Sequence, residues 1–296
     1  MQKATRAGFL YGLAAYGWWG LVPIYLAWLG KTPPLHFVAH RIVWSVVFLA
    51  LILTALGRWR ATLRALATPR LFAPLVVSAL LVGVNWLFYV LCFDHDAIVQ
   101  ASLGYFILPL VNVAMGLVLL RERPRPLQYV AIAVALVGVA WLTWSVGMVP
   151  WLSLGIAFSF SFYGLIRRHV PVDGVIGLTV ETVVLLPVVL AYLAVGYTTT
   201  TEFETPELLF KLAISGVITA VPLLCFGEAA RRLPFTMLGL MQYLAPSVQF
   251  VLAIWLFQED VQDWTGYVIV WTALAVFSLD SYLWFRTAEQ NPGTNL

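Results

Sequence analysis

Long apolar runs follow one another along the whole chain, separated by short polar segments. A helix that spans a bilayer needs about 20 apolar residues, because the hydrocarbon core is about 30 Å thick. A barrel of short alternating strands does not fit unbroken runs of this length. We therefore expect an all-α integral membrane protein with ten transmembrane helices, over residues 9–29, 35–56, 72–93, 99–120, 127–146, 151–166, 175–195, 208–227, 235–257 and 264–285.

Basic residues separate sharply between the two sides of these predicted helices. With a cytoplasmic N-terminus, 14 of the 17 lysines and arginines fall in cytoplasmic segments, and only Lys31 and Lys211 fall outside. The remaining one, Arg41, lies within the span over 35–56. Cytoplasmic loops of membrane proteins are enriched in Lys and Arg. Because a missed helix would destroy this separation, we expect both termini in the cytoplasm.

Composition excludes several other classes of protein. Hydrophobic types make up 61% of the residues, charged types only 10%, and the mean hydropathy is +0.89. Soluble domains carry about 25% charged residues, so a soluble enzyme and a nucleic-acid-binding protein are excluded. The two cysteines, Cys92 and Cys225, lie in apolar runs and offer neither a disulfide framework nor metal-ligand spacing. We expect no metal and no cofactor.

One pattern of polar and proline residues occurs twice, at a separation of 137 residues. The sequence SLGYFILPLVNVAMGLVLLRE begins at Ser102, and GLMQYLAPSVQFVLAIWLFQE begins at Gly239. Pro109 thereby aligns with Pro246. The repeat predicts two five-helix units with a short tail, over residues 1–147, 148–287 and 288–296 respectively.

An odd number of helices in each unit determines their relative orientation. The second unit must enter the membrane from the opposite side, so the repeat is inverted. Proteins with inverted repeats place the substrate near the bilayer midplane between the halves and work by alternating access. This functional step is an inference from the fold.

Ionisable residues inside the predicted spans are functional hypotheses, because charges are costly in a bilayer. Arg41 either faces a cavity and an anionic or zwitterionic substrate, or extends to the outer headgroups. Glu181 either titrates a proton or binds a cation, or it bonds locally to a neighbouring group. His40 is either a packing residue or a proton relay. The rise per helical residue places Arg41 and Glu181 about 10 Å apart along the membrane normal.

Polar and aromatic residues at similar depths complete the candidate site. The prolines Pro109 and Pro246 each remove a backbone hydrogen bond and are expected to break their helices and expose carbonyl groups. A polar helix–helix contact with two kinks is the alternative to a cavity wall. The candidate cavity residues are His40, Arg41, Asn85, Tyr89, Tyr105, Asn112, Tyr163, Glu181, Gln242 and Gln249.

Eight motifs in order give the chain a resemblance to a known family. They are AYGWWGLVPIY from residue 15, HRIVWS from 40, NWLFYV from 85, ASLGYFILPL from 101, FSFYGLIRR from 160, GLTVET from 177, VPLLCFGEAARRLP from 221 and LGLMQYLAPSVQF from 238. Together they resemble the RarD branch of the EamA-type drug/metabolite transporter superfamily, over about residues 7–286.

The resemblance implies a ten-helix protein of the bacterial inner membrane that transports a small molecule, most often as an exporter. Members are labelled chloramphenicol-sensitivity proteins, and related exporters handle amino acids and similar metabolites. It implies no particular substrate. No ATP-binding motif is present in the sequence, so proton exchange and facilitated diffusion both stay open. The oligomeric state also stays open, and a monomer is compatible with the pattern.

Two other functions compete with a secondary transporter. A channel or scramblase-like facilitator would show a hydrophilic pore stripe, usually completed by oligomerisation. An intramembrane enzyme would need a catalytic set at membrane depth. The spans contain neither H-E-x-x-H, nor G-x-S-x-G, nor a close pair of carboxylates. We therefore expect that the protein is not an enzyme and has no catalytic residues.

Overall fold

The computed structural model describes residues 2–95, 97–147, 149–199, 205–258 and 264–290. All regular secondary structure in these ranges is helical, which confirms the all-α prediction. The helices are α1 (Gln2–Leu29), α2 (Pro34–Leu56), α3 (Trp59–Ala67), α4 (Pro69–Asp94), α5 (Ile98–Val118), α6 (Pro126–Val146), α7 (Trp151–His169), α8 (Gly174–Thr199), α9 (Pro206–Arg232), α10 (Phe235–Met241), α11 (Leu244–Trp255) and α12 (Thr265–Gln290).

Every apolar run of the sequence forms a helix, but not every helix has the composition of a membrane span. Among the described residues, nine spans are long and apolar enough to cross a bilayer, with α10 and α11 counted as one. The helix α7 is not among them, because its serines and its terminal Arg167 and Arg168 lower its hydropathy. Nine of the ten predicted spans therefore meet the criteria of length and composition.

The short helix α3 occupies a segment that the sequence pattern assigned to a loop. Its nine residues are too few to cross the membrane. Trp59 and Leu63 are exposed on it, next to the basic Arg60 and Arg64. This combination is typical of a helix that lies along a membrane surface. A search for long apolar runs misses such an element.

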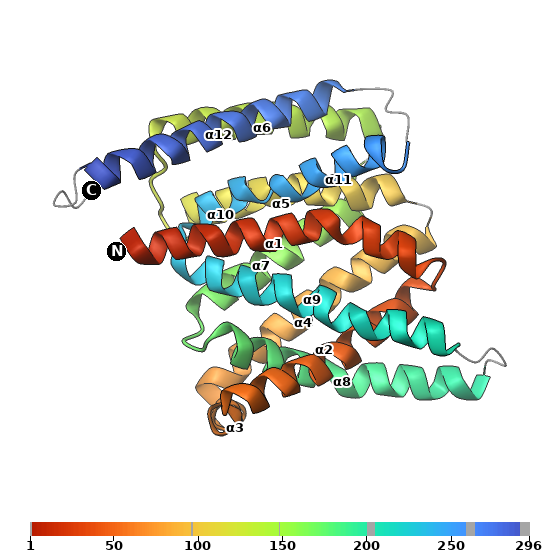
Figure 1. Cartoon of the computed structure of the whole chain (residues 1–296). Helices are drawn as coiled ribbons and strands as arrows, with labels where there is room; N and C mark the ends of the chain where they lie inside the picture. Colours follow the sequence, from red (N-terminus) through yellow and green to blue (C-terminus); the bar gives the residue numbers. More distant parts are fainter. Residues whose placement is uncertain (1, 96, 148, 200–204, 259–263, 291–296) are drawn as a thin grey trace.

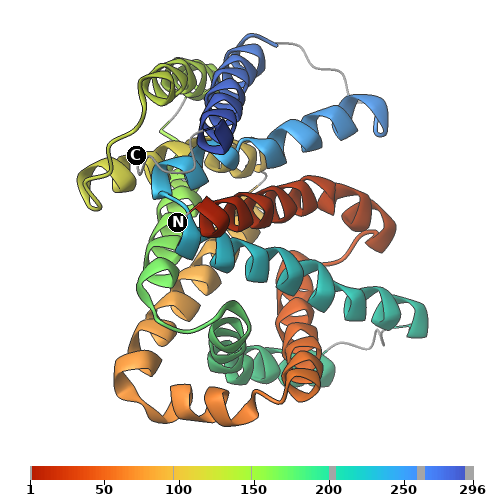
Figure 2. The same ribbon diagram turned by 60° about the vertical axis from the view of Figure 1, so that its left-hand side comes forward.

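The helices form a layered bundle (Figures 1 and 2). At one edge α6 packs against α12, and α5 with α10 and α11 forms the next layer. The centre contains α1, α7 and α9, and the opposite edge contains α2, α3, α4 and α8. The first turn of α1 and the last turn of α12 lie at the same end of the molecule (Figure 1).

Helices from the two parts of the chain exchange partners across the bundle. α1 packs against α9, and α7 packs against α4. α5 packs against both α7 and α10, and α1 packs against α11. An aromatic cluster lies where these helices meet, with the rings of Trp19 and Phe160 5.7 Å apart and those of Phe160 and Phe226 5.0 Å apart. The core of the bundle is therefore shared between the two parts.

The contact between α2 and α9 depends on a glycine. A Cβ atom at Gly216 would collide with the backbone of Trp44. The Ser45 hydroxyl donates a hydrogen bond of 3.2 Å to the Gly216 carbonyl at this contact. Because backbone atoms cannot move aside as a side chain can, any larger residue would separate the two helices.

Candidate functional site

Arg41 lies on α2 and reaches across to two neighbouring helices. Its Nε atom donates a 2.9 Å hydrogen bond to the Thr219 hydroxyl of α9. Its Cζ atom lies 4.5 Å from the centroid of the Trp86 ring on α4 and 5.5 Å from that of Phe37. These are cation–π distances. The side chain is thus held between helices.

Three tyrosines surround the same guanidinium. Tyr25 of α1, Tyr89 of α4 and Tyr105 of α5 all interact with Arg41 electrostatically. The rings of Tyr89 and Tyr105 are 6.3 Å apart. Arg41, Tyr89 and Tyr105 are only half-buried, although five helices contribute to this place. We call Arg41, Trp86, Tyr89, Tyr105 and Thr219 the Arg41 cluster.

Glu181 forms a second and separate group. One of its carboxylate oxygens accepts a hydrogen bond from the Ser78 hydroxyl, and the other accepts one of 3.4 Å from the Tyr163 hydroxyl. The Nε atom of Arg167 lies 3.5 Å from the same carboxylate, and both charged side chains are only 1% exposed. We call Ser78, Tyr163, Arg167 and Glu181 the Glu181 cluster. It joins α4, α7 and α8 through a buried ion pair.

Arg167 lies in a helix that extends beyond the bound predicted from the sequence. The sequence places the end of its helix at residue 166 and counts Arg167 with the cytoplasmic loop, but α7 continues to His169. A Cβ atom at Gly177 would collide with the Arg167 guanidinium, so this glycine provides the space for the arginine. The available signal was the spacing: Arg167 follows Tyr163 by one helical turn, on the same face.

The two ionisable residues singled out in the sequence do not meet. Arg41 pairs with Thr219 and Trp86, whereas Glu181 pairs with Arg167. Their separation along the membrane had already made a direct contact difficult. The third one, His40, is buried, with its ring centroid 4.6 Å from that of His36.

Amide side chains from the predicted set connect helices. Asn85 donates hydrogen bonds to the Ile156 carbonyl, at 2.8 Å, and to the Ser159 hydroxyl, at 3.2 Å. Gln249 donates one of 3.0 Å to the Trp19 carbonyl. These contacts join α4 to α7 and α11 to α1. The contact of Gln249 matches the helix–helix alternative, and Asn85 makes a contact of the same kind.

The two copies of the repeated sequence pattern contact each other at the centre of the bundle. Asn112 of α5 donates a 2.9 Å hydrogen bond to the Gln242 side chain. The Tyr243 hydroxyl lies 3.3 Å from the Phe106 carbonyl and donates to it. Phe106 and Tyr243 are 137 residues apart, which is the separation of the pattern repeated in the sequence.

The two repeated prolines differ in their effect on the backbone. α5 continues through Pro109 from Ile98 to Val118, so the expected break there is wrong. In the second unit the helix is interrupted at residues 242–243, four residues before Pro246. A proline cannot donate to the carbonyl four residues earlier, and the Gln242 carbonyl instead accepts a bond of 3.2 Å from the Ala245 amide.

A carboxylate that the sequence search did not select joins the two units at the end where the termini lie. Glu122 accepts hydrogen bonds from the backbone amides of Phe235, at 2.6 Å, and Thr236, at 2.8 Å. It also accepts one of 2.8 Å from the Thr236 hydroxyl. The Arg168 guanidinium lies 3.7 Å from it and donates to the Leu233 carbonyl. We call Glu122, Arg168 and Thr236 the Glu122 cluster.

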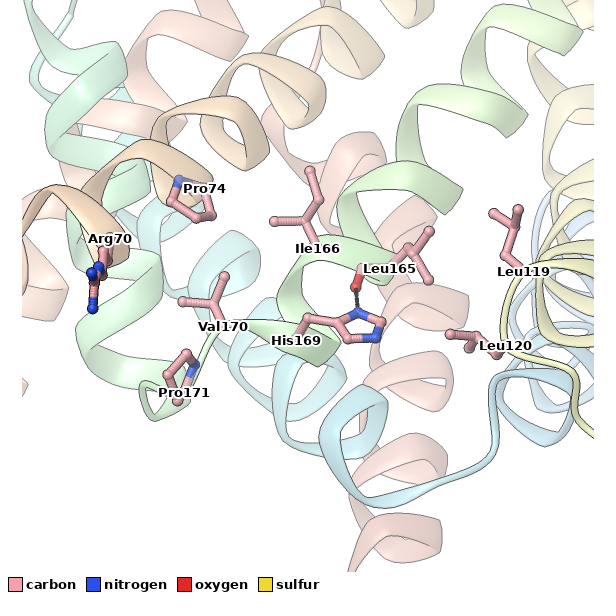
Figure 3. Close-up of a pocket in the computed structure, with 9 residues that line it drawn as sticks. All are labelled: Arg70, Pro74, Leu119, Leu120, Leu165, Ile166, His169, Val170 and Pro171. Carbon is pink, nitrogen blue, oxygen red and sulfur yellow. Dashed lines mark hydrogen bonds between the residues drawn. The ribbon is translucent and has the colours of Figure 1, made fainter.

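A pocket of about 480 Å³ opens at this same end, between α4, α5 and α7 (Figure 3). Apolar side chains line most of it, with Arg70 at one side and His169 near its centre. The His169 Nδ1 atom lies 2.8 Å from the Leu165 carbonyl. No residue predicted for the cavity lines this pocket, and the Arg41 cluster lies elsewhere.

Comparison with known proteins places the chain in a family. The model of the EamA-like transporter family matches residues 6–144. An uncharacterized transporter of Pseudomonas aeruginosa is 44% identical over 297 residues, which cover 97% of this chain and 98% of the relative. Protein RarD of Escherichia coli is 38% identical over 293 residues, with 97% and 99% covered.

A solved crystal structure supports the fold independently of close sequence similarity. The two structures superpose with a TM-score of 0.70 at 19% sequence identity, and the match covers 94% of this chain and 98% of the chain in the crystal structure. The sequence relatives extend over nearly the whole chain, and their names describe transporters or RarD proteins. The chain therefore belongs to the EamA-like transporter family and, within it, to the RarD-type membrane transporters.

Proposed function

We propose that this protein is a secondary transporter that exports a small metabolite across the bacterial inner membrane by alternating access. Ten spanning helices form two inverted five-helix units, over residues 1–147 and 148–287, with both termini in the cytoplasm. The direction of transport rests on the resemblance to exporters. The other parts of the proposal rest on the arrangement of the helices and on the Arg41 cluster.

The exchange of partners supports the inverted repeat. α1 and α7 are the first spanning helices of their units. α1 packs against α9 and α7 packs against α4, and each of these partners is the third spanning helix of the other unit, since the short α3 does not span. The contact between the equivalent residues Phe106 and Tyr243 is what a two-fold axis at this point would produce. The EamA-like family match over residues 6–144 also has nearly the bounds of the first unit.

Arg41 carries the transport proposal. It is a cation inside the bundle, half-buried, and held by helices of both units through Trp86 and Thr219. A contact that bridges the two units changes when they move against one another. Charged residues in such positions mark substrate or ion pathways in membrane proteins.

The position of the Glu122 cluster supports alternating access. It joins the two units at the end that contains the termini. Arg41 is seven residues from the start of α2, or about 10 Å at the rise of a helix, and α2 starts at the opposite end (Figure 1). We infer that the bundle is closed at the cytoplasmic end in this conformation, with the Arg41 cluster nearer the outer face.

A counterflow assay tests the proposed function. Proteoliposomes are preloaded with an unlabelled pool of organic acids, amino acids, nucleosides and chloramphenicol, and uptake of each labelled member is recorded. Transient accumulation above equilibrium is expected for one class and is the sign of a carrier. Uptake that only approaches equilibrium would favour the channel or scramblase-like facilitator instead. Absence of protein-dependent uptake for every member would contradict transport of these classes.

A further inference from the structure

The positive charge of the Arg41 cluster has no acidic partner among the side chains that the structure describes. No carboxylate of these residues lies within 4.0 Å of Arg41. The buried carboxylates Glu181 and Asp280 are paired with Arg167 and Arg125 instead. An unbalanced cation at membrane depth is costly, so an anion at this place would stabilise the protein.

The donors left open in the cluster match a carboxylate. Thr219 occupies only the Nε atom of Arg41, and the two Nη atoms have no hydrogen-bond partner among the described residues. Arg41 is half-buried, so its guanidinium is not fully enclosed by the protein. The Tyr105 hydroxyl is in the same situation. A guanidinium offers two parallel N–H groups to a carboxylate, and a phenol can donate a third hydrogen bond.

An ammonium group finds no carboxylate partner among the described side chains of the cluster. The rings of Trp86 and Phe37 are already engaged by Arg41. An amino acid would therefore bring a desolvated cation next to the Arg41 guanidinium. Like charges repel at short range, and an unpaired charge is expensive to bury.

We propose that Arg41 and Tyr105 bind the carboxylate of a monoanionic organic acid, and that the site selects such acids over the corresponding amino acids. This inference rests on the proposed transport function and names its substrate class. The half-buried ring of Tyr89 provides apolar surface for the body of the acid.

Matched pairs of ligands test the selection. The pairs are propionate with alanine, 4-methylpentanoate with leucine, and 3-phenylpropionate with phenylalanine, which differ within each pair by one ammonium group. Binding to the purified full-length protein is measured by isothermal titration and by the ligand-induced shift in thermal unfolding. In at least one pair, we expect the acid to bind about tenfold more tightly than its amino acid. Equal or tighter binding of the amino acids, or no binding of any acid, would overturn the proposal.

Three variants assign the effect to the cluster. Arg41→Lys keeps the charge but loses the paired donors, and Tyr105→Phe removes one hydroxyl, so both should weaken acid binding. Arg64→Lys changes an exposed arginine on α3 and serves as the matched control. Each variant should elute from a size-exclusion column as a single symmetric peak, as the native protein does, which serves as the check that it is folded. Unchanged acid binding in both Arg41→Lys and Tyr105→Phe would place the ligand elsewhere and overturn the assignment.

The same ligands in the counterflow assay separate the two proposals. Protein-free liposomes correct for passive entry of the neutral acids. Counterflow of a neutral or cationic compound, and of no acid, would support the transport function and overturn the carboxylate site. Tight binding of an acid without any counterflow would support the carboxylate site and contradict the transport function.

Discussion

The burial of Glu181 depends on Arg167, and the burial of Arg167 depends on Glu181. Each is 1% exposed, and each would be an isolated charge at membrane depth without the other. Ser78 and Tyr163 each donate a hydrogen bond to one oxygen of the carboxylate. A buried pair of this kind contributes little net stability while intact, but removal of one partner is strongly destabilising.

Glu181→Gln should therefore destabilise the protein by about 3–5 kcal/mol, because it leaves the Arg167 cation unpaired. The measurement is the free energy of unfolding in detergent. The double variant Glu181→Gln with Arg167→Met removes both charges and should recover most of the loss. If the single variant is as stable as the native protein, the ion pair is absent in solution. A change in the pH dependence of transport in this variant could then be attributed to the loss of the Glu181 carboxyl and not to unfolding.

At the scale of helices, small residues decide how closely elements approach. The α2–α9 contact requires Gly216, and the α7–α8 contact around Arg167 requires Gly177. Thr219 follows Gly216 by three residues, on the same side of α9. The closeness of α2 and α9 thus determines whether Thr219 can accept the hydrogen bond from Arg41.

Gly216→Ala should push α2 away from α9, because the new Cβ meets the Trp44 backbone and not a movable side chain. Overpacking of this kind costs about 1–3 kcal/mol. We expect lower thermal stability together with weaker ligand binding at the Arg41 cluster.

Gly196→Ala is the matched control for this substitution. It lies in α8, where nothing comes within 4 Å of the added Cβ. It should be neutral or slightly stabilising, because alanine has the higher helix propensity. Equal effects of the two substitutions would mean that the close approach of α2 and α9 does not limit stability.

At the scale of the whole molecule, the Glu122 cluster is one of the polar connections between residues 1–147 and residues 148–287, beside the ion pairs Arg58–Asp173 and Arg125–Asp280. The carboxylate accepts from two consecutive backbone amides at the start of α10. Since hydrogen bonds to a charged acceptor contribute about 1.5–3 kcal/mol, this cluster holds the start of α10 against the segment that contains Glu122.

Glu122→Ala should raise the hydrogen-exchange rate of the Phe235 and Thr236 amides by about tenfold or more, because they lose their acceptor. Exchange read by mass spectrometry on peptides that cover residues 230–240 measures this effect. Glu207→Ala, an exposed carboxylate at the start of α9, is the control and should leave these peptides unchanged. Protection that persists in Glu122→Ala would show that other contacts close this end.

The pattern of apolar runs determined the positions of the helices to within a few residues, because a membrane-spanning element must be apolar over its whole length. Arg41 and Glu181 were identifiable for the same reason, since a charge interrupts such a run. The short helix α3 and the extension of α7 to Arg167 were not, because both lie where polar residues obscure the boundary between helix and loop.

Only the tertiary structure decided which side chains meet. It separated Arg41 from Glu181, paired Glu181 with Arg167, and assigned Asn85 and Gln249 to contacts between helices. Hydropathy reports the depth of a residue along the membrane normal, but not its direction around the helix or the neighbour that it faces. Those depend on the packing of helices far apart in the chain, where a glycine such as Gly177 makes room for a particular side chain.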